Sequence, residues 1–278
     1  MKCETLGADT TVSRLAPVTS AATATNKGNW VNLGVTTFDW TSFGITFEVA
    51  INNNVAILDV AYGDNIIIPN LIMAMSFHQS TAITLCSMPL FIPSGATVRV
   101  RAQSAVTSTT VARVSVTGRS DYNKCYRSLD VYGVDTTSIS SVLVDPGGTT
   151  NTKGPWTAIG TASKQYDKMF CTVYPSTFPT NPSSANSMLL DVGVGPADNP
   201  TRVIKDQFFN VLATAYPIGN RIVSVTDIDI FPGDVIQARM QSTTATTNSR
   251  SLRVAAYCFY DAIPGRNASN YSRSLVKS

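Results

Sequence analysis

The sequence is short of charge and of the residues that most enzymes use for catalysis. Only 14% of its 278 residues are Asp, Glu, Lys or Arg, against roughly 25% in an average globular chain. One histidine, His78, excludes a repeated His-based triad and any histidine-rich metal site. Nucleophile-elbow, Walker and Rossmann motifs are absent as well. We therefore expect a protein that is not an enzyme and holds no cofactor or metal, with His78 in a loop.

Long apolar runs, a leader and a strong charge imbalance are also missing. The most apolar stretch, residues 55–77, is interrupted by Asp59, Asp64 and Pro69, so it does not form a membrane span of about 20 apolar residues. The first 16 residues lack the charged-then-apolar pattern of a secretory leader, and we expect synthesis in a cytoplasm. A net charge of +3 with no block of like charges argues against a nucleic-acid partner.

Cysteine is scarce and irregularly spaced. Five cysteines are an odd number, and none forms a Cys-x-x-Cys pair. Free thiols in a reducing cytoplasm are the favoured interpretation, with disulfides or a metal site as the alternative. The cysteines are Cys3, Cys86, Cys125, Cys171 and Cys258.

An internal repeat is the most informative feature that is present. A Lys-Gly-x-Trp motif, a Leu-Asp-Val strand followed by glycine, and an Arg-x-Gln-Ser motif each occur twice, in the same order. The repeated positions are Trp30, Asp59, Arg101 and Gln103 in the first copy, and Trp156, Asp191, Arg239 and Gln241 in the second. Because the order is kept, we interpret the repeat as two copies of one folding unit, each of common domain size.

The pattern within each copy predicts an all-β fold. Seven or so short β-branched and aromatic runs are separated by Gly, Pro, Asn or Asp, which is typical of a β-sandwich. We expect two tandem antiparallel, jelly-roll-like β-sandwiches related by the repeat. An unbroken apolar run at residues 66–77 is interpreted as a strand, although periodicity alone does not exclude a helix. The expected divisions are an N-terminal arm (1–26), a first sandwich (27–118), a linker that supplies the first strand of the second unit (119–152), a second sandwich (153–260) and a C-terminal tail (261–278).

Alternation along the strands places the repeated acid and base on one face. Asp59 and Arg101, and likewise Asp191 and Arg239, point away from the core. We predict a cross-strand ion pair on the exposed face of each unit, where such a pair contributes only about 0–1 kcal/mol. A subunit contact is the alternative. The two aspartates could also be imagined as a glycosidase pair, but equivalent sites in two domains lie far apart.

The aromatic residues allow two interpretations. We expect Trp30 and Trp156 to plug one end of each sandwich, with a sugar-stacking platform as the alternative. Tyr122, Tyr126 and Tyr132 in the linker are the candidates for an exposed aromatic patch, and packing against a neighbouring domain is the default there.

The order of these motifs resembles small β-sandwich modules in virion proteins of tailed bacteriophages. The resemblance covers residues 10–118 and 139–260, and it implies no catalytic residues. It implies a structural protein of the virion, on the capsid exterior as a decoration or head-fibre protein, that binds capsid protein and itself. A tail-fibre or receptor-binding protein that recognises a host-surface glycan is the alternative. An enzyme such as a depolymerase is the least favoured hypothesis.

We also expect a symmetric homo-oligomer, with a trimer favoured and a monomer with frayed ends as the alternative. Residues 1–26 and 261–278 lack a core pattern, and flexible ends of this kind can order on a partner. We therefore expect one of the two ends to reach a neighbouring subunit or the capsid.

Overall fold

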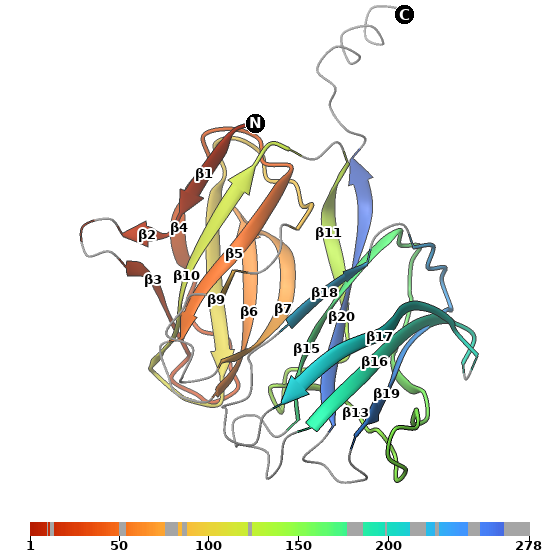
Figure 1. Cartoon of the computed structure of the whole chain (residues 1–278). Helices are drawn as coiled ribbons and strands as arrows, with labels where there is room; N and C mark the ends of the chain where they lie inside the picture. Colours follow the sequence, from red (N-terminus) through yellow and green to blue (C-terminus); the bar gives the residue numbers. More distant parts are fainter. Residues whose placement is uncertain are drawn as a thin grey trace, which may run out of the picture.

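The structure, a computed structural model, consists of β-strands and connecting loops (Figure 1). It describes residues 1–9, 11, 14–49, 54–75, 83–84, 88–121, 124–176, 186–197, 199–211, 221–225, 228–243 and 251–263. His78 and Cys86 lie outside these ranges, as does the tail from residue 264. Throughout the described ranges there is no helix long and apolar enough to cross a membrane.

The first ten strands form one sandwich, unit 1, from two antiparallel sheets. The larger sheet has the order β2-β3-β10-β5-β8, with β1 also paired to β10, and the smaller has the order β4-β9-β6-β7. The strands are β1 (Cys3–Leu6), β2 (Ala8–Asp9), β3 (Arg14–Thr19), β4 (Val31–Val35), β5 (Ser42–Val49), β6 (Asn54–Tyr62), β7 (Asn65–Met75), β8 (Ile83–Thr84), β9 (Thr97–Ser104) and β10 (Thr110–Arg119).

The next ten strands form a second sandwich, unit 2, on the same plan. Its larger sheet has the order β12-β13-β20-β15-β18, with β11 paired to β20, and its smaller sheet has the order β14-β19-β16-β17. The strands are β11 (Cys125–Tyr132), β12 (Val134–Asp135), β13 (Ser140–Val144), β14 (Thr157–Thr161), β15 (Lys168–Pro175), β16 (Asn186–Gly195), β17 (Thr201–Val211), β18 (Arg221–Val225), β19 (Val235–Ser242) and β20 (Leu252–Ile263).

Each strand of unit 1 therefore has a counterpart ten strands later, with the same neighbours. The predicted fold class, two tandem antiparallel jelly-roll-like sandwiches related by a repeat, is confirmed by this identical strand order. The apolar run that begins at Ile66 is a strand, β7, as expected.

The expected N-terminal arm needs correction, whereas the expected linker does supply the first strand of unit 2, together with two further strands. Residues 1–26 contain β1, β2 and β3, and residues 119–152 contain β11, β12 and β13; both sets belong to the larger sheets. The sequence pattern did not predict β3, because much of both faces of this strand is exposed to solvent. Only Val18 in it is fully buried. A strand of this kind shows little apolar alternation.

The core of each sandwich holds one large aromatic residue that the repeated motifs did not mark. Trp40 in unit 1 and Tyr166 in unit 2 are both buried, and each exchanges backbone hydrogen bonds with an isoleucine, Ile92 or Ile230. A Cβ on Gly118 would lie 1.9 Å from the Trp40 ring. In unit 2, Cys258 occupies the position that corresponds to Gly118 by strand register. Tyr166 is smaller than Trp40 and leaves room there for a side chain.

The two units share one buried interface. Unit 2 contributes to it an aromatic group from the outer face of its larger sheet, which joins the hydrophobic core of unit 1. Phe170 and Tyr257 stack in parallel with ring centroids 4.6 Å apart. In Figure 1, β11 lies beside β7 of unit 1, and β20 is the next strand of the same sheet. The group consists of Tyr126, Phe170, Tyr174, Tyr257 and Phe259.

Tyr257 also satisfies the backbone at the edge of unit 1. Its hydroxyl accepts a hydrogen bond from the amide of Ile72 in β7 (2.8 Å) and donates one to the carbonyl of Asn70 (3.1 Å). β7 ends the smaller sheet, and an edge strand has unpaired amides and carbonyls that invite further pairing. Unit 2 thus covers a sheet edge that unit 1 alone would leave open.

Four of the five cysteines are described, and all four are free thiols. Cys3 is exposed, whereas Cys125, Cys171 and Cys258 are buried. Burial raises the pKa of the Cys171 thiol to about 12 and raises that of Cys258 well above its usual value.

These thiols give a first prediction. Because the thiolate is the reactive form, a thiol reagent at pH 8 should modify Cys3 rapidly in the native protein and leave Cys171 and Cys258 unmodified. Unfolding without a reductant should expose all five. Peptide mapping by mass spectrometry separates the sites. Fewer than five modified cysteines after unfolding would contradict the free-thiol account, and rapid native labelling of Cys171 would contradict its burial.

Candidate functional site

The repeated motifs converge on one site in each unit, on the outer face of the smaller sheet. We call this site the aspartate cluster. In unit 1 it consists of Lys27, Trp30, Asp59, Asn70 and Arg101, and in unit 2 of Lys153, Trp156, Asp191, Asp206 and Arg239. The predicted cross-strand pairing is confirmed, since Asp59 lies opposite Arg101 and Asp191 opposite Arg239.

The central carboxylates are buried, which corrects the expectation of an exposed ion pair. Asp59 is 2% exposed and Asp191 is fully buried. The Nε atoms of Arg101 and Arg239 lie 2.8 and 3.1 Å from their carboxylates. Alternation gave the correct face of the sheet, but it carries no information about the side chains that cover that face.

A lysine and a backbone bulge complete the coordination of each carboxylate. Lys27 donates to Asp59 at 2.8 Å, and Lys153 donates to Asp191 at the same distance. The third donor is a backbone amide in the next strand, from Asn70 (2.8 Å) in unit 1 and from Asp206 (2.9 Å) in unit 2. Each carboxylate therefore has three donors, as a buried charge requires.

The bulge residues are held in an unusual conformation. Asn70 and Asp206 have positive φ values of 54° and 52°, where the strand registers shift opposite the central aspartates. Asn and Asp tolerate this region better than other residues with a Cβ. Their side-chain oxygens accept from Lys27 and Lys153, at 2.7 and 2.8 Å. The lysine therefore binds both the bulge and the central carboxylate.

The glycine in Lys-Gly-x-Trp is required by close packing. A Cβ on Gly28 would lie 2.3 Å from the carbonyl oxygen of Thr19, and one on Gly154 would lie 2.7 Å from that of Asp145. The amides of both glycines donate to the neighbouring strand. This close approach directs the preceding lysine towards the aspartate.

The tryptophans do not plug the sandwiches. Trp30 and Trp156 are half-buried on the outer face, and the guanidinium groups of Arg101 and Arg239 lie 4.4 and 4.6 Å from their ring centroids. Arg99 also lies over Trp30, at 4.8 Å. Since arginine already covers these rings, the geometry gives no support to a sugar-stacking platform at either tryptophan.

The electrostatic environment of Asp191 explains its ionised state. Burial would raise the pKa of this carboxyl group, but hydrogen bonds from Lys153, the Asp206 amide and Arg239 outweigh that effect and hold the pKa below 3.8. In unit 1, burial lowers the pKa of the Lys27 ammonium, and the contact with Asp59 offsets this in part. In both units the central carboxylate is therefore buried and paired with cations that remain partly exposed.

The lowered pKa of Asp191 leads to a prediction about acid. A carboxyl group with a lower pKa in the folded state contributes stability that is complete above the unfolded pKa, near 3.8, and is lost as the pH falls through the folded pKa. The denaturant midpoint should therefore drop below about pH 4. An Asp191→Asn variant, already weaker at pH 7, should lose less on the same acidification. Equal losses in the two proteins would contradict this account.

The two repeated glutamines, Gln103 and Gln241, have different roles. Gln103 is buried, and its amide donates to the carbonyl of Thr25 in unit 1 and to that of Thr136 in unit 2, the latter at 2.6 Å. It therefore ties the two units together. Gln241 is half-buried at the corresponding place in unit 2, where the described chain has no third unit beside it.

Each core aromatic residue also binds a carboxylate that lies outside the repeated motifs. The indole of Trp40 donates to Glu4 (2.6 Å), and the hydroxyl of Tyr166 donates to Asp130 (2.6 Å). Burial raises the pKa of Tyr166. Both carboxylates come from the first strand of their unit. Because the residue types differ between the copies, matching identical motifs could not find them.

The two linker tyrosines that the structure describes do not form an exposed patch. Tyr126 is buried in the inter-unit aromatic group, as the default interpretation of packing against a neighbouring domain expected, and Tyr132 is half-buried beside Tyr166. Tyr122 lies outside the described residues.

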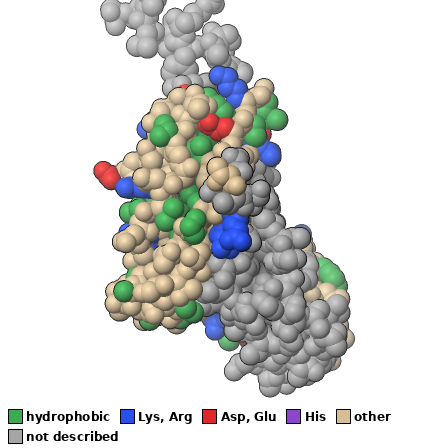
Figure 2. Space-filling model, turned by 90° about the vertical axis from the view of Figure 1, so that its left-hand side faces the viewer, with side chains coloured by type: hydrophobic (Ala, Val, Ile, Leu, Met, Phe, Trp, Pro, Cys, Tyr) green, Lys and Arg blue, Asp and Glu red, His purple; other side chains and the backbone are tan. Residues whose placement is uncertain are grey.

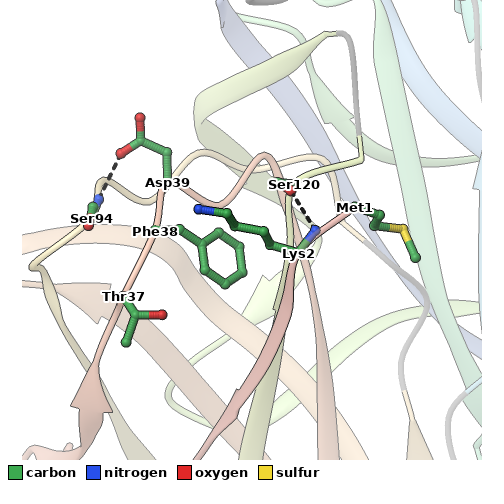
Figure 3. A pocket seen from close by; sticks show the side chains of 7 residues that line it. All are labelled: Met1, Lys2, Thr37, Phe38, Asp39, Ser94 and Ser120. Atoms are coloured by element: carbon green, nitrogen blue, oxygen red, sulfur yellow. Dashed lines mark hydrogen bonds between the residues drawn. The ribbon is translucent and has the colours of Figure 1, made fainter.

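A hollow of about 650 Å³ lies at one end of unit 1 (Figure 3). We call it the Phe38 hollow. It is lined by Met1, Lys2, Thr37, Phe38, Asp39, Ser94 and Ser120. One of its lining residues, Thr37, donates its backbone amide to Glu4. The Asp39 carboxylate accepts from the Ser94 amide at 2.8 Å, and the Lys2 ammonium lies 5.8 Å from the Phe38 ring centroid. An aromatic ring, an acid, a base and hydroxyl groups thus meet at one opening.

Within the described ranges, no three His, Cys, Asp or Glu side chains group as metal ligands would. The aspartates of the two clusters lie in separate sheets, each bound to its own lysine and arginine. Their arrangement gives no support to a shared pair of catalytic acids.

Comparison with known proteins gives matches to structures only. No family model matches the sequence, and no curated protein does. PNGase F, a glycosylasparaginase from Flavobacterium meningosepticum, matches at a TM-score of 0.37 and 10% identity, over 95% of this chain and 99% of that one. PNGF-II matches at 0.41 and 5%, over 93% of this chain and 66% of the other. A triple jelly-roll protein from an archaeal virus turret matches at 0.22 and 9%, over 90% and 60%.

These matches correct the expectation that the chain is not an enzyme. The glycosylasparaginase named above is an enzyme, so the absence of familiar catalytic motifs does not exclude catalysis for a chain of this architecture. At such TM-scores and identities, the likeness assigns no reaction, substrate or catalytic residue to this chain. The chain is similar to these proteins in its jelly-roll-like β-sandwich architecture.

Proposed function

We propose that this chain is a structural protein on the exterior of a virion, bound to capsid protein and to further copies of itself. The observation that carries the proposal is the fusion of two equivalent sandwiches into one block through buried aromatic rings. A block of this kind leaves few places for local opening. Resistance to local opening suits a protein exposed outside a cell to proteases and changing solvent.

The distribution of charge supports the same role. The repeated ion groups centre on carboxylates that are at most 2% exposed, where dissolved salt screens them weakly. On the face shown in Figure 2, the described side chains are largely uncharged and the charged ones are scattered. Contacts made through such a surface depend little on ionic strength, as an extracellular particle requires.

A rebinding experiment tests this function. Particles assembled without the chain are mixed with purified protein and sedimented at low salt and at about 0.5 M salt, where the screening length is only a few ångströms. The protein should sediment with the particles under both conditions and should raise their mass by a fixed copy number. Failure to bind at low salt would contradict the proposal.

Self-association is part of the proposal, with a trimer favoured. The N-terminal residues belong to a sheet of unit 1, so they do not supply the reaching arm that the sequence suggested. Residues 264–278, outside the described ranges, are the segment left for that contact. Light scattering should give a mass near three times 29.7 kDa, and removal of residues 264–278 should reduce it. A monomer at micromolar concentration would contradict self-association.

A second candidate function is attachment to a glycan on a host surface. The Phe38 hollow favours it, because small-molecule sites combine a concave shape, an aromatic wall and a few converging polar groups. Purified protein that binds host cells in the absence of particles would support attachment. Binding to particles alone would support only the structural role.

A further inference from the structure

The Phe38 hollow is a place where the two units differ. Strand registers align Lys2 with Ser128 and Ser120 with Tyr260. Phe38 and Lys164 correspond by position, since each lies four residues before its strand, β5 or β15. In unit 2, the Lys164 ammonium lies 3.6 Å from the Tyr260 ring centroid and 3.0 Å from Asp130. A lysine thus closes this place in unit 2, whereas unit 1 has a phenylalanine beside an open hollow.

The groups around the hollow come from four separate parts of the chain, one of which is Ser120, just after β10. Phe38 and Asp39 lie in the loop before β5, Ser94 in the turn before β9, and Lys2 just ahead of β1. The half-buried Phe38 ring packs against the core, so its position is fixed from behind. The Ser94 amide orients the Asp39 carboxylate, and the Ser120 hydroxyl accepts from the Lys2 amide at 2.9 Å.

We propose that the Phe38 hollow binds an acidic saccharide, a sugar ring that carries a carboxylate. The inference rests on the second function proposed above, attachment to a host-surface glycan. The Phe38 ring offers an apolar face for the C–H side of a pyranose. Asp39 accepts hydrogen bonds from its hydroxyl groups. Lys2 is exposed, and its flexible ammonium can turn from the Phe38 ring to the sugar carboxylate.

The volume fits this class of ligand. About 650 Å³ lies within the roughly 300–1,000 Å³ of small-molecule sites and accommodates one or two sugar rings. A single polar ligand of this size in an open site binds weakly, with a dissociation constant on the order of 1 mM. Several copies on one particle would raise the effective affinity by multivalency.

The test compares two sugars that differ in one group, D-glucuronate and D-glucose. Each is titrated into the full-length protein and followed by NMR amide shifts. Glucuronate should bind saturably near 1 mM and glucose at least about fivefold more weakly, since the carboxylate contact is lost. Phe38→Lys and Lys2→Ser introduce the residues that unit 2 carries at these places. Each variant should weaken glucuronate binding roughly tenfold.

Lys205→Ser is the matched control, because Lys205 is an exposed lysine on β17 that does not line the hollow. It should bind glucuronate like the original protein. Unfolding midpoints establish that the variants are folded. The proposal is overturned if glucuronate fails to saturate at about 20 mM, if glucose binds equally well, or if both hollow variants bind like the control. Host-cell binding that survives Phe38→Lys would overturn this site and leave the attachment function standing.

Discussion

Replacement of Asp191 by alanine should lower the free energy of unfolding by about 3–5 kcal/mol. The carboxylate is fully buried and accepts hydrogen bonds from Lys153, the Asp206 amide and Arg239. Its removal leaves two cations and an amide without their common partner, and a buried group left unpaired costs far more than an exposed one. Denaturant unfolding measures the change.

The matched control is Asp64→Ala. Asp64 also pairs with an arginine, Arg99, at 2.8 Å, but its side chain is fully exposed, so its removal should leave the unfolding midpoint unchanged. Asp59→Ala in unit 1 should behave like Asp191→Ala. A small effect at both buried aspartates would show that the clusters do not hold the smaller sheets together.

Replacement of Tyr257 by alanine should cost about 3–5 kcal/mol as well, and should separate the unfolding of the two units. The ring stacks on Phe170 inside the interface, and the hydroxyl pairs with the open edge of β7. Without it, unit 1 loses part of the surface that covers its edge. We expect the single transition of the original protein to split into two, as weakly coupled domains do.

A second variant separates the contribution of the Tyr257 ring from that of its hydroxyl group, and a third serves as the control. Tyr257→Phe keeps the ring and removes the hydroxyl, which should cost about 1–3 kcal/mol because its hydrogen bonds with the Ile72 amide and the Asn70 carbonyl are lost. Thr117 is the residue of unit 1 that corresponds to Tyr257 by strand register. Among the described residues, its face of the sheet does not pack against another unit. Thr117→Ala should therefore leave the transition single and little shifted. One unbroken transition in Tyr257→Ala would contradict the coupling of the units through this ring.

The repeat made the architecture predictable, because identical motifs in one order require equivalent strands. It also predicted the Asp59–Arg101 pairing, since alternation fixes which side chains share a face. The burial of Asp59 could not be predicted from alternation. It depends on Lys27, which reaches over from the loop before β4, and on the Asn70 bulge, whose positive φ has no unique sequence signature.

The interface between the units did have a signal in the sequence. Strand β7 is apolar on both faces, as is β20 from Ala255 to Phe259. In β10 of unit 1, the positions that correspond to the outward-facing residues of β20 include Ser115 and Thr117. A strand that is apolar on both faces in only one of two copies indicates a contact that the other copy does not make. The core aromatics Trp40 and Tyr166 gave no such signal, because their types differ.

A cryo-EM map of the intact particle tests the central claim most directly. The account predicts density on the capsid exterior that fits two side-by-side sandwiches as one block, with β7 of unit 1 against β11 and β20 of unit 2, repeated at symmetry-related positions. Purified particles that lack the chain, or a map whose exterior density is fully explained by other proteins, would contradict it.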